Sequence, residues 1–190
     1  MGGELSARTL GYGMLDRDHL TKHLFELAQR EGVDKVTMRG LASQAGTSTS
    51  SVYYHVAGKA ELLDLLIEAV VNSIEVPTDG EWQDRVVALY TNAWRVLVTV
   101  RGIAGLLQQR PHTTAAANMD RATRAILRES GLSKRAFNAA YALLYVHLLG
   151  SVELEHNRAA QAARGAGRAE ATFRDGLQII LTGLRHANER

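Results

Sequence analysis

The chain has 190 residues, of which 46% are apolar and 22% charged, with two prolines and no cysteine. This length and apolar share are sufficient to bury a substantial core, and they exclude a chain that is disordered throughout. The lack of cysteine excludes a disulfide scaffold, thiol catalysis and a cysteine-ligated metal site within these residues. The formal net charge is only +2, so the composition does not indicate a strongly basic coat for nucleic acid.

The longest largely apolar run spans residues 139–152 and contains His147. A membrane-spanning helix needs about 20 apolar residues, so we expect no membrane segment. Residues 1–14 contain four glycines and lack the apolar centre of a signal peptide. We therefore expect a cytoplasmic protein that begins with a flexible arm at 1–14. This arm is either a solvated tail or one whose Arg8 reaches a DNA minor groove.

Helical periodicity begins at Asp16 and continues to the end of the chain, with no long alternation of period two. Residues that favour helix starts and stops divide the first part into four helices. Their boundaries are marked by Asp16 or Asp18, Gly32, Thr37, Gly46, Ser48, Ala57-Gly58 and Lys59.

Five further helices follow a linker at 75–80. Their expected ranges are 82–100, 103–109, 113 or 114 to 129, 133–157 and 169–187, and residues 158–168 are either loop or frayed helix. The prediction is an all-α fold of about nine helices. It divides into an N-terminal domain at 15–75 and a larger helical domain at 81–190.

The segment from Thr37 to Leu62 carries the most specific pattern, because two short helices meet at a tight turn around Gly46. This is a helix-turn-helix, whose second helix enters the DNA major groove with its first residues toward the bases. Hydroxyl groups there can bond phosphates and base edges, and Lys59 at a helix start can meet a phosphate. The predicted DNA-binding residues are Thr37, Arg39, Thr47, Ser48, Thr49, Ser50, Ser51, Tyr53, Tyr54, His55 and Lys59.

This segment resembles the DNA-binding domain of the TetR family of bacterial transcriptional repressors, in particular the branch of the tetracycline repressor. The resemblance rests on Thr37, Arg39, Leu41-Ala42, Ala45-Gly46, Ser48, Tyr53, His55, Lys59 and Leu62. Ser50, Thr47 and Val56 depart from the residues common in the family, which leaves the target sequence open. The resemblance implies a homodimer on a palindromic operator of double-stranded DNA.

The helix at 133–157 is apolar on more than one face, which a single helical domain cannot bury completely. One stripe contains Phe137, Tyr141, Leu144, Leu148 and Ser151, and another contains Leu143, Val146 or His147, Gly150 and Leu154. One stripe can face the core and the other a second subunit, unless both are core. Family members dimerise through a four-helix bundle of the last two long helices. The predicted interface consists of Leu144, Leu148, Ser151, Val152, Leu177, Ile180, Leu181 and Leu184.

The resemblance also implies a pocket for a small effector, apolar or aromatic, in the larger domain. Candidate lining residues are Tyr90, Trp94, Leu97, His112, Met119, Tyr141, Tyr145 and His147. For Trp94, Leu97 and His147 a role in the core or in an interface is the alternative, and for His112 a solvated loop position.

We expect a ligand-responsive repressor that is not an enzyme and uses no cofactor or metal. No nucleophile motif, phosphate loop or pair of facing carboxylates is present in the sequence. Two alternatives stay open: a helix-turn-helix regulator without an effector, and a helical interaction module without DNA binding.

Overall fold

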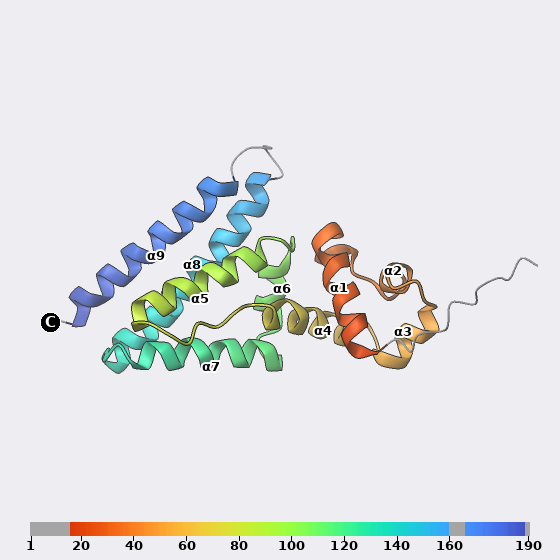
Figure 1. Cartoon of the computed structure of the whole chain (residues 1–190), viewed down its shortest axis with the longest axis horizontal. Coiled ribbons are helices and arrows are strands. Elements are labelled where there is room, and N and C mark those ends of the chain that lie inside the picture. The colour runs from red at the N-terminus through yellow and green to blue at the C-terminus, as the bar shows by residue number, and fades with distance from the viewer. Residues whose placement is uncertain (1–15, 160–165, 189–190) are drawn as a thin grey trace, which may run out of the picture.

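The computed structural model describes residues 16–159 and 166–188, which form helices and no β-strand (Figure 1). The all-α prediction is confirmed for this part of the chain. The predicted arm with Arg8 lies outside the described residues, as does most of the segment 158–168. The helices are α1 Arg17–Glu31, α2 Met38–Gln44, α3 Thr49–His55, α4 Lys59–Asn72, α5 Trp82–Leu97, α6 Ile103–Gln109, α7 Thr114–Arg128, α8 Lys134–Ala159 and α9 Ala166–Asn188, with a 3₁₀ turn at Val33–Lys35.

Side-chain caps begin these helices where the sequence predicts them. Asp16 accepts the backbone N–H of His19 at 2.7 Å, and Thr37 accepts that of Gly40 at 3.0 Å. Ser48, Thr113 and Ser133 cap α3, α7 and α8 in the same way. Each cap satisfies a backbone donor that has no partner within the helix, typically stabilising the helix by about 1 kcal/mol. The chain therefore enters these helices through local hydrogen bonds.

Helix α4 connects the two parts of the molecule (Figure 1). It contacts α1 on the side of the N-terminal helices and α5, α6 and α7 on the other side. Its residues Leu62, Leu66 and Ile67 are fully buried, and Val71 is 8% exposed. The predicted division near residue 75 stays a prediction, because α4 packs against both groups of helices.

The last residues of α1 also touch the turn between α5 and α6. The Val33 N–H donates to the Arg101 carbonyl at 2.9 Å, and the Arg101 guanidinium donates to the Glu31 carbonyl at 3.0 Å. Gly32 adopts φ +84°, and a Cβ there would lie 3.1 Å from Arg101 Nε. Glycine thus permits both the backbone turn and the close approach.

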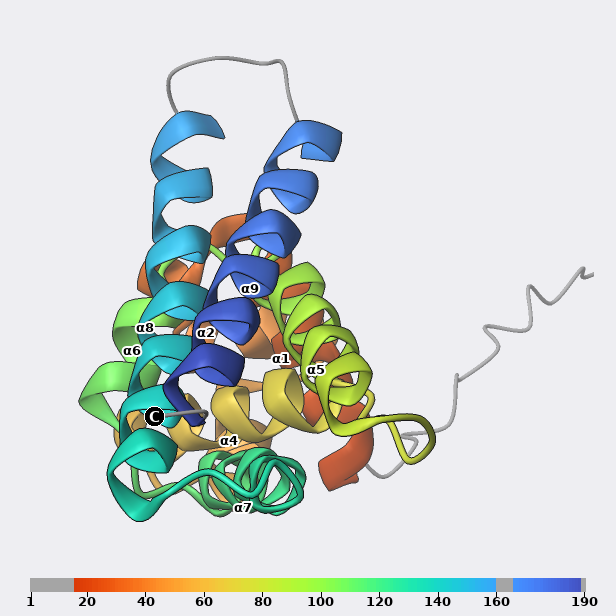
Figure 2. The same ribbon diagram turned by 90° about the vertical axis from the view of Figure 1, so that its left-hand side faces the viewer.

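Helices α8 and α9 lie side by side at the end of the molecule opposite α2 and α3 (Figures 1 and 2). Within the described residues α8 is the one helix long and apolar enough to cross a membrane, with a mean hydropathy of 1.2 over 18 residues. This differs from the expectation that no segment would qualify. A core helix of a soluble protein passes the same test, but only 28% of this window is buried. Much of the apolar length of α8 is therefore uncovered in the single chain.

The contact between α8 and α9 depends on Gly176, which has no side chain. The His147 ring stacks on Phe173 with centroids 4.8 Å apart, and its Nε2 donates to the Phe173 carbonyl at 2.9 Å. The ring fills the space beside Gly176, where a Cβ would lie 2.7 Å from Nε2. His147 is therefore a structural residue of the helix pair.

We expect Gly176→Ala to lower the free energy of unfolding, measured by chemical denaturation, by roughly 1–2 kcal/mol. Displacing a packed ring costs about 1–3 kcal/mol, which exceeds the gain of up to about 1 kcal/mol from helix propensity. Gly105→Ala is the matched control, because Gly105 is also inside a helix but has no atom within 4 Å of the place that a Cβ would take. Equal effects of the two substitutions would contradict the assigned role of His147.

Candidate nucleic-acid interface and ligand cavity

Helices α2 and α3 form a helix-turn-helix at the far end of the molecule from α9 (Figure 1). Gly46 has φ +63°, and the Thr47 N–H donates back to the Ala42 carbonyl at 2.9 Å. Leu41 and Val52 are fully buried, so one side of each helix faces the core of the N-terminal helices. The outer side of α3 is left free to contact a partner.

None of the predicted DNA-binding residues is buried. Tyr53 and Tyr54 on α3 are 55% and 87% exposed, and Lys59 is exposed at the first position of α4. The other exposed members are Thr37, Arg39, Ser48 and Ser50, and the half-buried ones are Thr47, Thr49, Ser51 and His55. The hydroxyls of Thr37 and Ser48 each accept a backbone N–H, so these two residues also hold the start of their helices.

The local charge of this surface suits a polyanion. Arg39 and Lys59 are its basic residues, and no acidic residue occurs between them in the sequence. The nearest carboxylate along the chain, Glu61, accepts the Ala57 N–H at 2.7 Å and so is tied to the start of α4. Hydroxyl, phenol and amine groups on one exposed face can donate hydrogen bonds to phosphates and to base edges.

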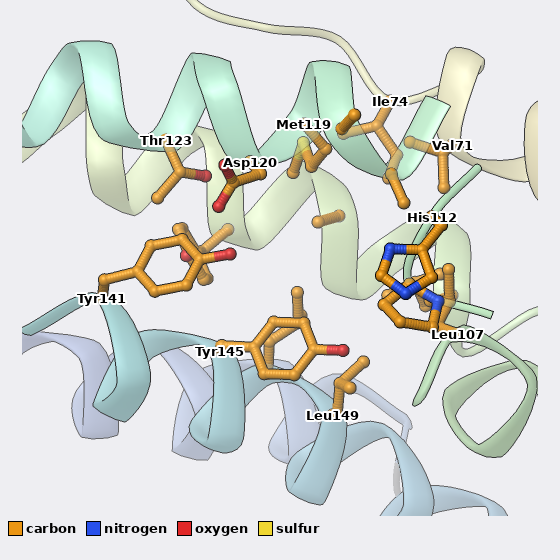
Figure 3. A pocket seen from close by; sticks show the side chains of 17 residues that line it. Val71, Ile74, Leu107, His112, Met119, Asp120, Thr123, Tyr141, Tyr145 and Leu149 are labelled. Carbon is orange, nitrogen blue, oxygen red and sulfur yellow. The ribbon is translucent and has the colours of Figure 1, made fainter. Parts of the chain in front are cut away.

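A cavity of about 470 Å³ lies between α4, α5, α6, α7 and α8. Figure 3 shows Asp120, Thr123 and Tyr141 at one end and Val71, Ile74, Leu107 and His112 at the other. Between them lie Met119, Tyr145 and Leu149. A volume of this size with an apolar lining and a few grouped polar atoms is typical of a site for a small organic molecule.

Hydrogen bonds and burial organise the polar end of the cavity. Burial raises the pKa of Tyr90, whose phenol also bonds Thr123. Burial, together with a hydrogen bond to Asp120, raises the pKa of Tyr141 to about 12. Burial raises the pKa of Tyr145 as well. These phenols therefore stay protonated at neutral pH and can act as hydrogen-bond donors.

The structure places six of the predicted pocket residues on this lining: Tyr90, Leu97, His112, Met119, Tyr141 and Tyr145. Trp94 and His147 are not on it. Trp94 is 5% exposed and stacks on Phe173 of α9, with ring centroids 5.7 Å apart. His147 of α8 forms a hydrogen bond with the Phe173 carbonyl. The prediction that these two residues line the cavity is wrong, because both turn toward α9.

Most of the predicted dimer interface is also wrong. Leu144, Val152 and Leu177 are fully buried within the single chain, and Leu148, Leu181 and Leu184 are at most 6% exposed. These residues form the core between α8, α9 and their neighbours, and Leu148 lines the cavity. Ser151 and Ile180 are half-buried. The core therefore contains Leu144 and Leu148 of one α8 stripe, two residues that the predicted interface includes.

The other stripe is exposed. Leu143, Val146 and Leu154 on α8 are 52%, 65% and 57% exposed, and Ile179 on α9 is 73% exposed. Gly150 and Gly183 lie on the same helices with open space around them. We call Leu143, Val146, Gly150, Leu154 and Ile179 the outer apolar face. An apolar surface of this kind on a soluble protein typically marks an interaction site.

Sequence reasoning also missed part of the cavity lining. Thr123 is four residues after Met119 and three after Asp120 on α7, and so lies close to both on the helix surface. Val71 and Ile74 come from the end of α4 and the residues just after it, which the sequence pattern assigns to the N-terminal domain. Helical spacing could have identified the first pair, whereas the second depends on the tertiary contact of α4.

Two family descriptions match the chain. Residues 21–66 match bacterial regulatory proteins of the tetR family, and residues 76–170 match the tetracyclin repressor-like C-terminal domain. The first match covers the helix-turn-helix, and the second covers α5 to α8, which surround most of the cavity.

Individual relatives agree with these matches. The chain is 30% identical over 145 residues to an HTH-type transcriptional regulator of Saccharopolyspora erythraea, covering 75% of this chain and 61% of the relative. It is also 30% identical over 178 residues to the class D tetracycline repressor protein of Escherichia coli, covering 87% and 80%. The aligned part therefore spans about three fifths of the length of the first relative.

Solved structures show the same fold. ActR of Streptomyces coelicolor, solved in complex with actinorhodin, has a TM-score of 0.73 at 24% identity, covering 93% of this chain and 99% of ActR. BioQ of Mycobacterium smegmatis has a TM-score of 0.75 at 23% identity, covering 90% and 97%. BioQ is also solved with its double-stranded DNA operator. On the two family matches and the tetracycline repressor alignment, the chain belongs to the TetR family of bacterial regulatory proteins.

Proposed function

We propose that this protein is a transcriptional repressor that binds a palindromic DNA operator as a homodimer and releases it when a small molecule enters the cavity. The observation that carries the proposal is the exposed side of α3. It combines hydroxyl residues, Tyr53 and Tyr54 next to Lys59, on a helix-turn-helix held by buried Leu41 and Val52. The solved operator complex of BioQ, which has the same fold, supports this role.

The outer apolar face supports the homodimer. Its residues Leu143, Val146 and Leu154 repeat at spacings of three and eight along α8, so they lie on one side of the helix. Two copies related by a two-fold axis would bury this face in a bundle of four helices. The same axis would present two α3 helices to successive turns of one DNA face, about 34–36 Å apart, which requires a palindromic site.

Helix α4 supplies the physical route from ligand to DNA. Its first residue, Lys59, follows α3 closely in the chain, and Val71 near its other end lines the cavity together with Ile74. Lys59 and Val71 belong to one unbroken helix of 14 residues, which is about 21 Å long at about 1.5 Å per residue. The two ends can therefore move together as one rod. A ligand that fits only one position of α4 shifts the population toward that position.

The test is selection of bound duplexes from a random DNA pool with the purified full chain at moderate salt. We expect enrichment of a palindrome with half-sites about one helical turn apart. Enrichment of an unpaired half-site would contradict the dimer on DNA. No enrichment from a sample shown to be folded would contradict sequence-specific binding and favour a helical interaction module.

On the selected operator, Lys59→Ala should weaken binding to every duplex by a similar factor and lower the slope of log affinity against log salt by about one, because one phosphate contact is lost. Fluorescence anisotropy at several salt concentrations measures both quantities. Arg128→Ala is the matched control, since it removes the same charge from the exposed end of α7. An unchanged salt slope for Lys59→Ala would contradict the docking of α4 on the DNA backbone.

Val146→Arg should convert the dimer to a folded monomer, because it places a charge in the centre of the outer apolar face while Val146 is 65% exposed in the single chain. Light scattering gives the mass, and circular dichroism confirms the fold. Ala125→Arg, an exposed position on α7, is the control and should stay dimeric. A folded dimer of Val146→Arg would assign the dimer contact to another surface.

A further inference from the structure

We propose that the cavity selects a flat aromatic ligand that carries a protonated amine, and that the amine binds at Asp120. The inference rests on the proposed function, since it takes the cavity to be the effector site. It goes further by assigning the charge of the ligand and the residue that binds the charged group.

The charge of the lining is the first observation. Among the described residues that line the cavity, Asp120 carries the single carboxylate, and no lysine or arginine is present. The remaining polar groups are the phenols of Tyr90, Tyr141 and Tyr145, the Thr123 hydroxyl and the His112 imidazole. A ligand carboxylate would lose water without gaining a cationic partner and would be repelled by Asp120. A ligand ammonium would gain a charge-assisted hydrogen bond there.

Asp120 and Tyr141 already hold one cation. The Arg124 Nε lies 2.9 Å from each carboxylate oxygen of Asp120, and its guanidinium carbon lies 4.2 Å from the centre of the Tyr141 ring. A carboxylate and an aromatic face both attract a cation, and here they stand side by side. Arg124 is not part of the lining, so it occupies this environment from outside the cavity.

The carboxylate retains capacity for a second donor. An ionised carboxylate has about four lone-pair positions, and the Arg124 guanidinium and the Tyr141 phenol use only some of them. Asp120 is 38% exposed at its side chain, and it points toward the cavity beside Tyr141 in Figure 3. An amine that enters the cavity can therefore share Asp120 with Arg124, and the two cations compete for it.

The shape of the lining selects the body of the ligand. The Tyr141 and Tyr145 rings are nearly parallel, at 11° with centroids 6.5 Å apart, and form one wall. Met119, Ile74 and Leu149 add apolar surface away from Asp120 (Figure 3). Flat aromatic rings stack well on tyrosine rings and pack against thioethers. The cavity thus has a largely apolar body, and its one carboxylate lies at the end formed by Asp120, Thr123 and Tyr141.

Three probes with one aromatic body test the charge: 9-anthracenemethylamine, 9-anthracenemethanol and 9-anthracenecarboxylate. Their affinities are measured from anthracene fluorescence on the full-length protein at about pH 7, where the amine is protonated and the carboxylate ionised. We expect the amine to bind about tenfold more tightly than the alcohol, as one charge-assisted hydrogen bond allows. We expect the carboxylate to bind most weakly. Equal or tighter binding of the carboxylate would overturn the inference.

Two substitutions should move the affinity for the amine in opposite directions. Asp120→Asn should abolish the preference for the amine over the alcohol. Arg124→Gln should raise the affinity for the amine severalfold, because it frees the carboxylate from a competing cation. A general loosening of α7 would weaken binding in both variants. Asp84→Asn, an exposed position on α5 outside the lining, is the control and should change nothing. Loss of amine binding in both variants would overturn the inference.

Release of the selected operator separates this inference from the proposed function. If the alcohol or the carboxylate binds best and releases the DNA, the cavity is an effector site but the assigned ligand charge is wrong. If no probe binds while the protein still holds its operator, the assigned ligand class is wrong, whereas the proposed DNA-binding function stands. Operator release by the amine at the lowest concentration is the expected result.

Discussion

The packing of α4 against two groups of helices constrains the whole molecule. Leu62 and Leu66 are fully buried in its first half, and Val71 lines the cavity near its other end. The start of the helix comes directly after α3, so a displacement of α4 by a ligand cannot leave the helix-turn-helix where it was. The Arg110–Asp64 ion pair at 2.5 Å adds a polar link from the turn after α6 to the middle of α4. In the proposed function, ligand binding and DNA binding therefore both depend on the position of this one helix.

The second constraint is the apolar length of α8. A helix that is apolar on all sides needs cover on all sides, and in the single chain its neighbours, α5, α6, α7 and α9, leave the outer apolar face bare. His147 and Phe173 fix α9 against α8, so this face has contributions from both helices in a defined register. A second copy of the same surface is the simplest cover, because a two-fold axis pairs each apolar residue with another. The cavity on the inner side of α8 and the contact on its outer side are then separated by the thickness of one helix.

Much of the fold could be predicted from local signals. The caps at Asp16, Thr37, Ser48, Thr113 and Ser133 and the helix-ending Gly32 and Gly46 depend on neighbouring residues, which the sequence displays directly. The helix-turn-helix residues could be predicted for the same reason. The roles of the two apolar stripes on α8 could not, because both have the correct spacing and only the positions of the neighbouring helices decide which is inside. The prediction for Trp94 failed for the same reason. Its aromatic ring suits either a pocket or a core, and its contact with Phe173 places it in the core.

The hydrogen bond from the Val33 N–H to the Arg101 carbonyl joins the two parts of the molecule through main-chain atoms. Substitution of either side chain, except by proline at 33, leaves this donor and acceptor in place. The residues proposed to face DNA and those that line the cavity can therefore change separately while the joint between them keeps its geometry. New operators and new ligands can be combined on one frame without redesigning how the halves meet.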